Sequence, residues 1–586
     1  MANDKLISAD AIAKGLKLQK LKLSALAPFI LKALKLEKVN TLYANHQQDT
    51  GAVFADEILK ELKVDYEYNP EELNNIPKSE PFIVIANHPY GGIDGMMLLK
   101  IITQMRPDFK IMANFLLQQI PPLKDNFVSV NPFESVNKSG LNIAGIKRCL
   151  TLLKEGHPIG IFPAGEVSSL KLTNLKVSDK MWSPVVGKMI MKAQVRVVPV
   201  FFSGHNSLAF NLLGLVHPAL RTAKLPSELF NKSDEKIKIR IGKPVSVKTL
   251  NEFKEPNELL RFLRAKTYAL ESSLEVESKP FLKLHLQKPA EPEPIIEPTD
   301  LNLILQDIKR AEAKDLLFTH DTWKVFISPA KFIPNVLREI SRLREITFRE
   351  VGEGTNRSCD TDEYDLHYRH LFIWDDENQK IVGAYRIGLG DVLYRKYKKQ
   401  GFYLNDLFKI KKEFGPILKQ SLELGRSFVA KEYQRKPYSL MLLWKGVNEF
   451  LKKENYRYKY LIGPVSISNS FSALSKDLLV DFITKHHFDN ELAKYVKPRN
   501  KYQYQYKGEG AALRHLNNDD IKVLDNMISE IETSQNKIPV LLKKYLKQNA
   551  RIIAFNIDPK FNNALDGFLV MNIEEVPEDT FEMVMR

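Results

Sequence analysis

A histidine and an aspartate lie close together in the N-terminal half of the chain, as His88 and Asp94 with five residues between them. They belong to a Gly-rich segment, residues 86–95, that follows directly on an apolar run at residues 82–85. A histidine held by a carboxylate at the end of a strand is a good general base, because the acid fixes the tautomer of the imidazole and stabilises the imidazolium that forms. The alternative is a Gly-rich turn with no chemistry, and the pair by itself leaves both interpretations open.

Two further blocks repeat the pattern of an apolar run followed by a turn or a proline. Residues 161–168 read Ile-Phe-Pro-Ala-Gly-Glu-Val-Ser, and residues 197–200 read Val-Val-Pro-Val. The three blocks in this order resemble the glycerolipid acyltransferase family, related to lysophosphatidic acid acyltransferases, over about residues 60–250. The resemblance implies an α/β domain at a membrane surface. It makes His88 and Asp94 catalytic, for deprotonation of an acceptor hydroxyl that attacks an acyl thioester, and it gives substrate-binding positions at Gly165, Glu166 and Pro199.

Two departures from the family pattern bear on the geometry and on the acceptor. The family usually has four residues between the two catalytic groups, whereas five separate His88 from Asp94, so the pair cannot be read as neighbours on a helix. Gly91 and Gly92 can absorb the extra residue in a turn. Val167 stands where the family has an arginine, and a valine cannot grip a phosphate as a guanidinium does. We therefore expect an acceptor without a glycerol phosphate.

A second series of polar residues lies in the C-terminal half. It comprises an Arg-x-x-x-Phe pair, an Asp-x-x-Asp pair, a single arginine and a Glu-x-x-Arg pair. Its members are Arg344, Phe348, Asp362, Asp365, Arg386, Glu423 and Arg426. Separately, each pattern is typical of a helix or strand with surface charges. Chemically, a carboxylate can orient or deprotonate an amine, and an arginine can hold a carboxylate or a phosphate.

The whole series resembles the acyl-homoserine-lactone synthases and the ornithine-lipid N-acyltransferases of the GNAT superfamily, from about residue 315 to the C-terminus. Such enzymes join a fatty acyl group from acyl carrier protein to the α-amine of an amino acid. The resemblance favours Glu423 as the catalytic carboxylate and gives the other six positions substrate-binding roles; a purely structural pair with Arg426 is the alternative. Residues 538–546 and 558–562 also resemble the ends of the ornithine-lipid acyltransferases, which favours a lipid product.

The sequence also bears on the acyl donor and on cofactors. The GNAT pyrophosphate loop would fall on residues 434–439, where Pro437 and Ser439 replace the small residues that let backbone amides approach a CoA diphosphate. This favours acyl carrier protein, which is acidic, as donor to a chain with a net charge of +15; acyl-CoA is the alternative. No bound cofactor is expected. Cys149 and Cys359 lie far apart, so no metal site is expected either.

The elements that must position these residues fall into two domains, as a length of 586 residues requires. Between about residues 80 and 245, β-rich apolar runs alternate with helical stretches, which predicts an α/β domain with a largely buried sheet over residues 60–275. A Pro-rich linker follows at residues 279–299. Beyond it, mixed helices and strands predict an independent GNAT-like α+β domain over residues 315–586.

Residues 1–40 have the pattern of a basic amphipathic helix, in which lysines alternate with leucines. An anchor lying on anionic lipid and a terminal helix packed on the domain both fit this pattern. No signal peptide is visible, and polar residues interrupt the apolar stretch at 195–220, so no spanning helix is expected. We expect a cytoplasmic protein bound peripherally to the inner face of the cell membrane.

Together the two resemblances imply a bifunctional enzyme similar to bacterial ornithine-lipid synthases. It would N-acylate an amino acid, with ornithine favoured and glycine open, using a 3-hydroxyacyl group from acyl carrier protein, and would then O-acylate the 3-hydroxyl. The expected partners are the carrier protein, an anionic membrane surface, the amino acid and the lyso-aminolipid, without nucleic acid. Two alternatives stay open: a phospholipid-remodelling 1-acylglycerol-3-phosphate-type acyltransferase, and a non-catalytic peripheral membrane protein, as the older label "hemolysin" would imply.

Overall fold

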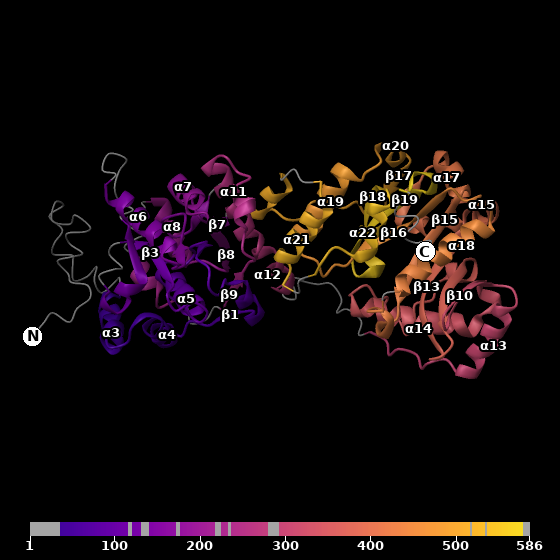
Figure 1. The fold of residues 1–586 in the computed structure, drawn as a ribbon, viewed down its shortest axis with the longest axis horizontal. Coiled ribbons are helices and arrows are strands. Elements are labelled where there is room, and N and C mark those ends of the chain that lie inside the picture. The colour runs from indigo at the N-terminus through magenta and orange to yellow at the C-terminus, as the bar shows by residue number, and fades with distance from the viewer. Residues whose placement is uncertain are drawn as a thin grey trace, which may run out of the picture. The chain divides into compact units, whose positions relative to one another are not determined.

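The computed structural model describes residues 35–577 with several internal gaps. The gaps are residues 115–119, 131–139, 172–175, 217–223, 232–235, 279–291, 437, 516–518 and 534–535. The chain divides into two compact units (Figure 1). The N-terminal unit contains residues 1–274 and 507–516, and the C-terminal unit contains residues 275–506 and 517–586.

The N-terminal unit is built on a seven-stranded sheet. In sheet order its strands are β1 (Tyr66–Tyr68), β9 (Ile237–Ile241), β8 (Arg196–Phe202), β2 (Phe82–Ala86), β5 (Ile159–Ile161), β3 (Lys110–Asn114) and β4 (Phe127–Val130). Neighbouring strands are parallel except for β8 and β9. Parallel strands are covered on both faces, which explains why β2 and β8 read as nearly continuous apolar runs. The α/β class predicted for this domain is confirmed.

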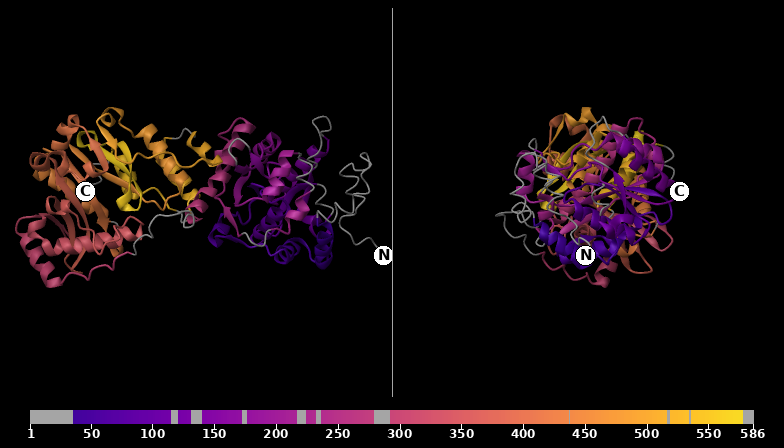
Figure 2. Two further views of the ribbon diagram at one scale, coloured as in Figure 1. Left: turned by 180° about the vertical axis from the view of Figure 1, so that it is seen from behind. Right: turned by 90° about the vertical axis from the view of Figure 1, so that its left-hand side faces the viewer.

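Helices cover both faces of this sheet (Figures 1 and 2). One face packs against α4 (Gly51–Glu61) and α5 (Gly92–Thr103), and the other against α7 (Pro184–Ala193) and α11 (Pro256–Ala269). The other helices described up to residue 278 are α3 (Leu36–His46), α6 (Gly140–Lys154), α8 (Leu208–Val216), α10 (Val247–Leu250) and α12 (Glu271–Ser278). The side chains of β2 pack into the hydrophobic cores on both faces of the sheet. The position of its C-terminal end, and so of the residues that follow it, is therefore fixed by packing.

A short segment from far along the sequence completes the N-terminal unit. Residues 507–516 belong to this unit, although the sequence on both sides of them belongs to the other. Their 3-10 helix η12 (Glu509–His515) packs against α11. No sequence pattern predicted this placement, because the segment carries neither an apolar run nor a motif.

The C-terminal unit is built on an eight-stranded sheet. In sheet order its strands are β10 (Leu316–His320), β11 (Trp323–Pro329), β12 (Arg369–Asp375), β13 (Lys380–Leu389), β15 (Ser421–Val429), β16 (Tyr460–Ile467), β19 (Ala564–Asn572) and β18 (Arg551–Asp558). Its helices are α13 (Leu301–Glu312), α14 (Pro334–Glu350), α15 (Gly390–Tyr397), α16 (Leu404–Leu407), α17 (Gly415–Lys419), α18 (Ser439–Lys453), α19 (Ala473–His486), α20 (Asn490–Ala493), α21 (Ile521–Ile531) and α22 (Val540–Lys547). The pairing is antiparallel except between β15 and β16, which α18 connects. The predicted α+β class is confirmed.

The strands β15 and β16 separate along their length. Their first three residues pair, ending at Glu423 opposite Ile462. Beyond that point no ladder pair joins these described strands, although β15 has nine residues and β16 has eight. Where they part, a Cβ on Gly463 would collide with the backbone oxygen of Leu424, so only glycine fits. The two strands therefore open a wedge inside the sheet.

Several predicted features fall wholly or partly outside the described residues. Of the basic segment at 1–40, the structure describes only residues from 35 onward, and α3 begins at Leu36. Of the Pro-rich stretch at 279–299, it describes residues 292–299, which form no helix or strand. Within the described ranges, none of the helices combines the length and hydropathy that a membrane span requires.

Candidate active sites

The loop after β2 brings His88 and Asp94 together. The Nδ1 atom of His88 lies 3.0 Å from Oδ2 of Asp94. Asp94 is fully buried in the first turn of α5, and its Oδ2 accepts the backbone N–H groups of Tyr90 (2.8 Å) and Gly91 (2.9 Å). Gly91 has a φ of +88°, which other residues rarely adopt. The loop therefore folds around the carboxylate, and the five-residue spacing preserves the contact between the two side chains.

The surroundings of this pair suit a general base at His88. Burial raises the pKa of the Asp94 carboxyl, and the adjacent imidazole opposes that shift. The imidazole stacks on Phe162 with ring centroids 4.0 Å apart. Within the described part of the chain, no group hydrogen-bonds to Nε2 of His88, whose side chain is 17% exposed. Because Nδ1 faces the carboxylate, Nε2 is the atom left to take a proton from a bound hydroxyl.

Asp179 is a buried residue that no sequence pattern predicted, and its carboxylate binds the backbone of the loop that carries His88. Its Oδ1 accepts the backbone N–H of His88 (3.1 Å) and the hydroxyl of Ser168 (2.6 Å), and its Oδ2 accepts the indole N–H of Trp182 (3.0 Å). The backbone N–H of Ser168 donates to the backbone oxygen of His88 (2.8 Å). Asp94 thus holds the histidine side chain, while Asp179 holds its backbone.

The three predicted substrate-binding positions of this unit lie in different surroundings. Gly165 lies in the turn after β5 with a φ of +68°, and its N–H donates to the backbone oxygen of Phe162 (3.0 Å). Glu166 follows it and pairs with Lys180 at 2.7 Å. Pro199 is buried within β8. The turn of Gly165 and Glu166 is therefore joined to His88 through the Phe162 ring, whereas Pro199 lies inside the sheet.

Val167 occupies the position where the family pattern has an arginine. It is 6% exposed. A Cβ on Gly91 would lie 3.2 Å from Cγ2 of Val167, so this valine packs against the histidine loop. An apolar side chain rather than a phosphate-binding cation therefore borders the His–Asp pair.

The helix η12 contributes an acid that supports this site indirectly. Oε1 of Glu509 accepts bonds from Nη2 of Arg264 (2.8 Å) and Nζ of Lys171 (2.8 Å). Nη2 of Arg264 also donates to the backbone oxygen of Asp179 (2.7 Å). Burial alone would raise the pKa of Glu509, but the bonds from Arg264 and Lys171 outweigh it and lower the pKa to about 2. Glu509 is therefore charged at neutral pH and is linked through Arg264 to the residue that holds His88.

In the C-terminal unit, three arginines and three aspartates form one buried ion-pair network. Its members are Arg344, Arg386, Arg426, Asp360, Asp362 and Asp365. Arg344 donates to both oxygens of Asp365 at 2.9 Å, and Arg386 lies 3.3 Å from the same carboxylate. Burial would raise the pKa of Asp365, but the two guanidinium groups hold it far below its ordinary value. Five predicted positions therefore meet in one network, together with Asp360, which was not predicted.

Arg426 forms the cavity-facing edge of this network. Its Nε lies 3.0 Å from Asp360, and its Nη2 lies 3.3 Å from Asp362. The guanidinium also lies over the rings of Tyr403 and Phe561, 4.9 and 4.4 Å from their centroids. Arg426 has a φ of +51°, which places it outside ordinary strand geometry. The guanidinium is thus held on one side by acids and on the other by aromatic rings.

Glu423 lies on β15, away from the cavity described below. Its Oε2 accepts the hydroxyl of Tyr368 and the backbone N–H of Tyr403 (3.1 Å), and its Oε1 accepts the backbone N–H of Leu404 (2.7 Å). Burial raises its pKa to about 7. Among the described residues, no ion pair joins it to Arg426, which pairs with aspartates instead. Both carboxylate oxygens of Glu423 are therefore occupied by protein groups, and its catalytic role stays a prediction.

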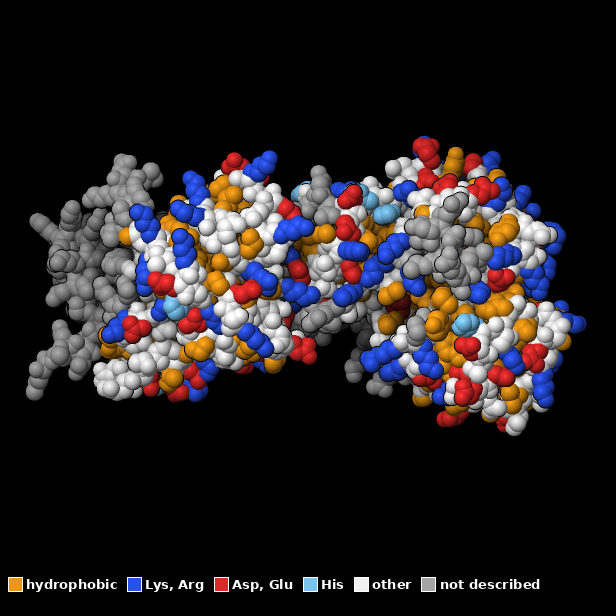
Figure 3. Space-filling view, in the orientation of Figure 1, with side chains coloured by type: hydrophobic (Ala, Val, Ile, Leu, Met, Phe, Trp, Pro, Cys, Tyr) orange, Lys and Arg blue, Asp and Glu red, His pale blue; other side chains and the backbone are white. Residues whose placement is uncertain are grey.

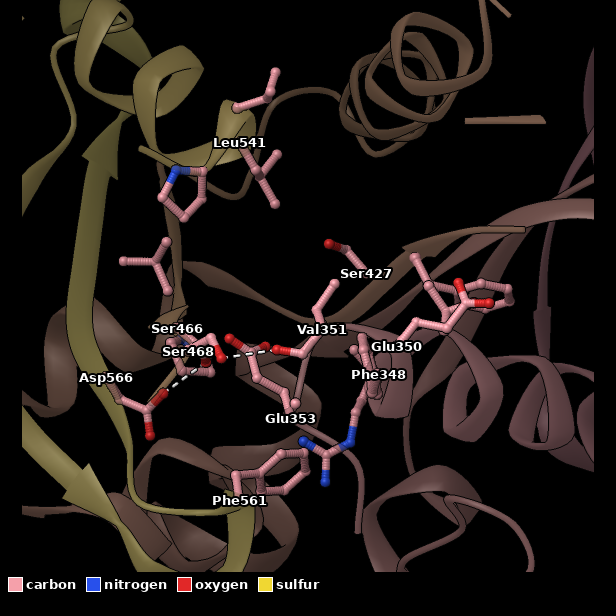
Figure 4. A pocket seen from close by; sticks show the side chains of 18 of the residues that line it. Phe348, Glu350, Val351, Glu353, Ser427, Ser466, Ser468, Leu541, Phe561 and Asp566 are labelled. Atoms are coloured by element: carbon pink, nitrogen blue, oxygen red, sulfur yellow. Dashed lines mark hydrogen bonds between the residues drawn. The ribbon is translucent and has the colours of Figure 1, made fainter. Parts of the chain in front are cut away.

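A cavity of about 980 Å³ opens at the wedge between β15 and β16 (Figure 4). This volume lies in the range of sites for small molecules and cofactors. Ser427 of β15, Ser466 of β16, Leu541 of α22 and Phe348 near the end of α14 line it. Of the seven positions predicted for this half, Phe348 and Arg426 reach the cavity. Four other positions lie outside the cavity lining and belong to the ion-pair network that holds Arg426; they are Arg344, Asp362, Asp365 and Arg386.

Comparison with known proteins agrees with this division into two sites. Residues 22–277 match a family described as "Acyltransferase", and residues 343–445 match one described as "Acetyltransferase (GNAT) domain". The first range contains the His–Asp pair, and the second contains all seven positions predicted in the C-terminal half.

Three curated proteins are similar to parts of the chain. Glycine N(alpha)-acyltransferase of Bacteroides thetaiotaomicron is 30% identical over 304 residues, covering 49% of this chain and 88% of that protein. The protein of the same name from Phocaeicola vulgatus is 29% identical over 303 residues, covering 49% and 91%. The chain belongs to the family of these glycine N(alpha)-acyltransferases. This acyltransferase is also 24% identical over 250 residues to the lyso-glycine lipid O-acyltransferase of B. thetaiotaomicron, covering 41% of the chain and 88% of that protein.

The identification confirms that this acyltransferase is an enzyme and that it combines a glycerolipid-type domain with a GNAT domain. It does not name the residues that act. Asp179, Asp360, Glu353 and Asp566 had no signal in the sequence, because each is a single acidic residue outside the patterns described above; Asp558, by contrast, begins the stretch at 558–562.

Replacement of Glu509 by alanine in this acyltransferase is expected to weaken O-acyl transfer while N-acyl transfer is unchanged. The substitution leaves Arg264, whose side chain is 11% exposed, without its carboxylate partner. Loss of such a partner costs about 1–3 kcal/mol, and the linked shift of Asp179 would misplace His88. Separate assays of the two reactions check this, with Glu574→Ala as control because that residue forms an exposed pair with Lys459. Equal O-acyl transfer in both variants would refute the link.

Proposed function

We propose that this acyltransferase makes a phosphorus-free aminolipid in two successive steps. The C-terminal unit joins a 3-hydroxyacyl group to the α-amine of an amino acid, and the N-terminal unit then acylates the 3-hydroxyl of that product. One observation carries the proposal: a single chain is similar both to glycine N(alpha)-acyltransferases and to a lyso-glycine lipid O-acyltransferase. These names describe an N-acylation and the O-acylation of a lyso-lipid, which chemically can follow one another.

In the O-acylation, His88 is the general base. Its Nε2 removes the proton from the 3-hydroxyl, whose oxygen attacks the thioester carbon; the new C–O bond forms, the C–S bond breaks, and the imidazolium returns the proton to the leaving thiolate. Asp94 stabilises that imidazolium through Nδ1, 3.0 Å away. The apolar Val167 beside the loop supports an acceptor that carries no phosphate.

The acyl donor of the N-acylation is acyl carrier protein, with no cofactor bound to the enzyme. The facing edges of β15 and β16 carry backbone groups without a ladder partner beyond Glu423, and an extended chain with amide groups, such as the phosphopantetheine arm, can pair with such edges. Ser439 lies where a CoA-binding loop would need a small residue, is buried, and donates its hydroxyl to the backbone oxygen of Tyr433 (2.9 Å). Because the Ser439 side chain fills the place where backbone amides would approach a diphosphate, this loop favours a donor without one.

The amino acid favoured by the cavity is ornithine. Four carboxylates line the cavity, those of Glu350, Glu353, Asp558 and Asp566, against three cationic side chains, those of Arg349, Arg426 and Lys537. Acids therefore outnumber bases in the lining, and ornithine, which carries a net positive charge, complements such a lining better than glycine, whose charges cancel. Glycine is the second candidate, because the relatives at 29% and 30% identity are named for it.

The enzyme is proposed to work at the cytoplasmic face of the membrane, where its lipid substrate resides. On the face seen in Figure 3, Lys and Arg side chains are spread over both units rather than gathered in one patch. The eight lysines of residues 1–38, which alternate with leucines in an amphipathic pattern, are the favoured membrane contact.

Deletion of residues 1–38 is accordingly expected to release much of the protein from anionic vesicles. Each basic residue near an anionic surface contributes about 1 kcal/mol. Binding of the full-length protein should also fall steeply as salt screens surface charges, since the Debye length is about 10 Å at 0.1 M. Vesicle flotation of both proteins at low and high salt measures this. Equal flotation would exclude the anchor, and unfolding of the truncated protein would favour a packed terminal helix.

Purified enzyme tests the proposed reactions directly. It is incubated with 3-hydroxyacyl carrier protein and an equimolar mixture of ornithine and glycine, and the products are identified by mass. We expect an N-acyl amino acid, followed by its O-acylated form when a second acyl donor is supplied. Acylation of lysophosphatidic acid without amino acid products would point to phospholipid remodelling, and absence of any acyl transfer would point to a non-catalytic membrane protein.

A further inference from the structure

Two carboxylates line the same cavity in the C-terminal unit. Asp566 comes from β19, and Glu353 follows α14 (Figure 4). The charge of Glu353 acts on Asp566, so the two lie close together. Neither belongs to the ion-pair network that holds Arg426, and neither was singled out by a motif.

These carboxylates lack the partners that buried charges need. Asp566 is 3% exposed, and its Oδ1 accepts the hydroxyl of Ser466 at 2.6 Å. In the described part of the chain, no group bonds to its Oδ2 or to the carboxylate of Glu353. A buried carboxylate without a donor is costly, so a cationic ligand in the cavity would complete its bonding.

The protonation of these groups fits an exchange of protons with an amine. Burial, together with the charges of Asp558 and Glu353, raises the pKa of Asp566 to about 8, while the bond from Ser466 and the charge of Arg426 oppose the shift. Burial raises the pKa of Glu353 to about 7. A carboxylate with such a pKa is a far stronger base than an ordinary one and can accept a proton from an ammonium group.

We propose that Asp566 and Glu353 bind the α-ammonium group of the amino acid and that Asp566 accepts the proton this group must lose. Arg426 lines the same cavity, and its charge acts on Asp566, so it is placed to hold the α-carboxylate. The inference rests on the proposed N-acylation and assigns the acceptor site of that reaction.

The step balances as follows. The ammonium gives one proton to Oδ2 of Asp566, and the free amine attacks the thioester carbon. The C–N bond forms, the C–S bond breaks, and the second proton lost by the nitrogen goes to the thiolate, which leaves as a thiol. The carboxyl of Asp566 then releases its proton to solvent. No oxidant, metal or further reactant is needed.

Replacement of Asp566 by asparagine tests the assignment, because asparagine keeps the size and the bond to Ser466 but cannot take the proton. We expect the kcat/KM of N-acylation to fall by about 10²–10⁴-fold, the usual contribution of a general base. Glu353→Gln should mainly raise the KM for the amino acid. Glu574→Gln, at an exposed position paired with Lys459, is the control.

The pH profile separates a base from a structural residue. The charged and titratable groups that face Asp566 are Glu353, Asp558, Arg426 and Tyr403. In the wild type, activity relative to Asp566→Asn should rise as pH passes about 8, where Asp566 loses its proton. Ser466→Ala removes a bond that lowers this pKa, so it should move the rise to higher pH.

The outcomes keep the two proposals distinct. An inactive wild type would refute the proposed N-acylation itself. An active wild type with an equally active Asp566→Asn variant, or with an unmoved profile in Ser466→Ala, would refute only the assignment of Asp566. A far-UV circular dichroism spectrum and a thermal unfolding curve like those of the wild type confirm that the C-terminal unit of each variant is folded. If Asp566→Asn does not fold, the Ser466→Ala profile alone decides.

Discussion

Replacement of His88 by alanine is expected to stop the second acylation and leave the first intact. The substitution removes the only imidazole that faces Asp94 among the described residues, and loss of a general base lowers a rate by about 10²–10⁴-fold. The cavity between β15 and β16, where we propose that N-acylation takes place, lies in the other compact unit and shares no residue with this site. Lipid extracts from expressing cells should therefore accumulate the lyso-aminolipid and contain little of the diacylated form.

His157→Ala is the matched control for this experiment. His157 also contacts an aspartate, Asp108, at 3.1 Å in the same unit, but about a third of each side chain is exposed. This variant should make both products at wild-type levels. Loss of both products in a folded His88→Ala protein would contradict the division of labour between the two units, and full O-acylation would remove His88 from the mechanism.

Replacement of Arg426 by alanine is expected to abolish both lipids. The substitution deprives Asp360 and Asp362 of a partner and removes one of the cations that line the cavity. Truncating one member of a buried charge pair costs about 2–5 kcal/mol or more, which corresponds to a large loss of N-acylation. Without N-acylation the N-terminal unit has no acceptor, so the O-acylated lipid also disappears.

Lyso-aminolipid supplied to the Arg426→Ala strain should restore the diacylated lipid, because the His–Asp site is unchanged. Arg457→Ala is the control, since Arg457 belongs to the same unit but pairs with Glu454 and Asp391 at a half-exposed position. Failure of the supplied lipid to restore the product, with the N-terminal unit still folded, would argue against sequential chemistry.

Sequence patterns predicted the fold classes because the pattern and the burial have the same cause. β2 is apolar at every position since helices cover both faces of its sheet, and such a continuous apolar run can be recognised in the sequence itself. The His–Asp pair was likewise visible, but its geometry was not. A φ of +88° at Gly91 and two backbone hydrogen bonds to Asp94 accommodate the extra residue. Neither feature can be inferred from the number of residues between His88 and Asp94.

The Glu-x-x-Arg pattern shows why the second site was harder to predict. Side chains three positions apart on a regular strand point to opposite faces. β15 is not regular, because its register against β13 shifts between Ala384 and Arg386 and Arg426 has a positive φ. Arg426 consequently reaches the cavity, while Glu423 is occupied by Tyr368 and two backbone N–H groups.

Mass spectrometry of lipids from a host that lacks aminolipids tests the central claim most directly. Cells that express the full chain should gain a phosphorus-free, ninhydrin-positive lipid. Its mass should equal that of one amino acid bearing an amide-linked 3-hydroxyacyl group and a second, ester-linked acyl group, and its fragments should identify the amino acid. An unchanged lipid profile, or new phospholipid species without any aminolipid, would contradict the two-step synthesis.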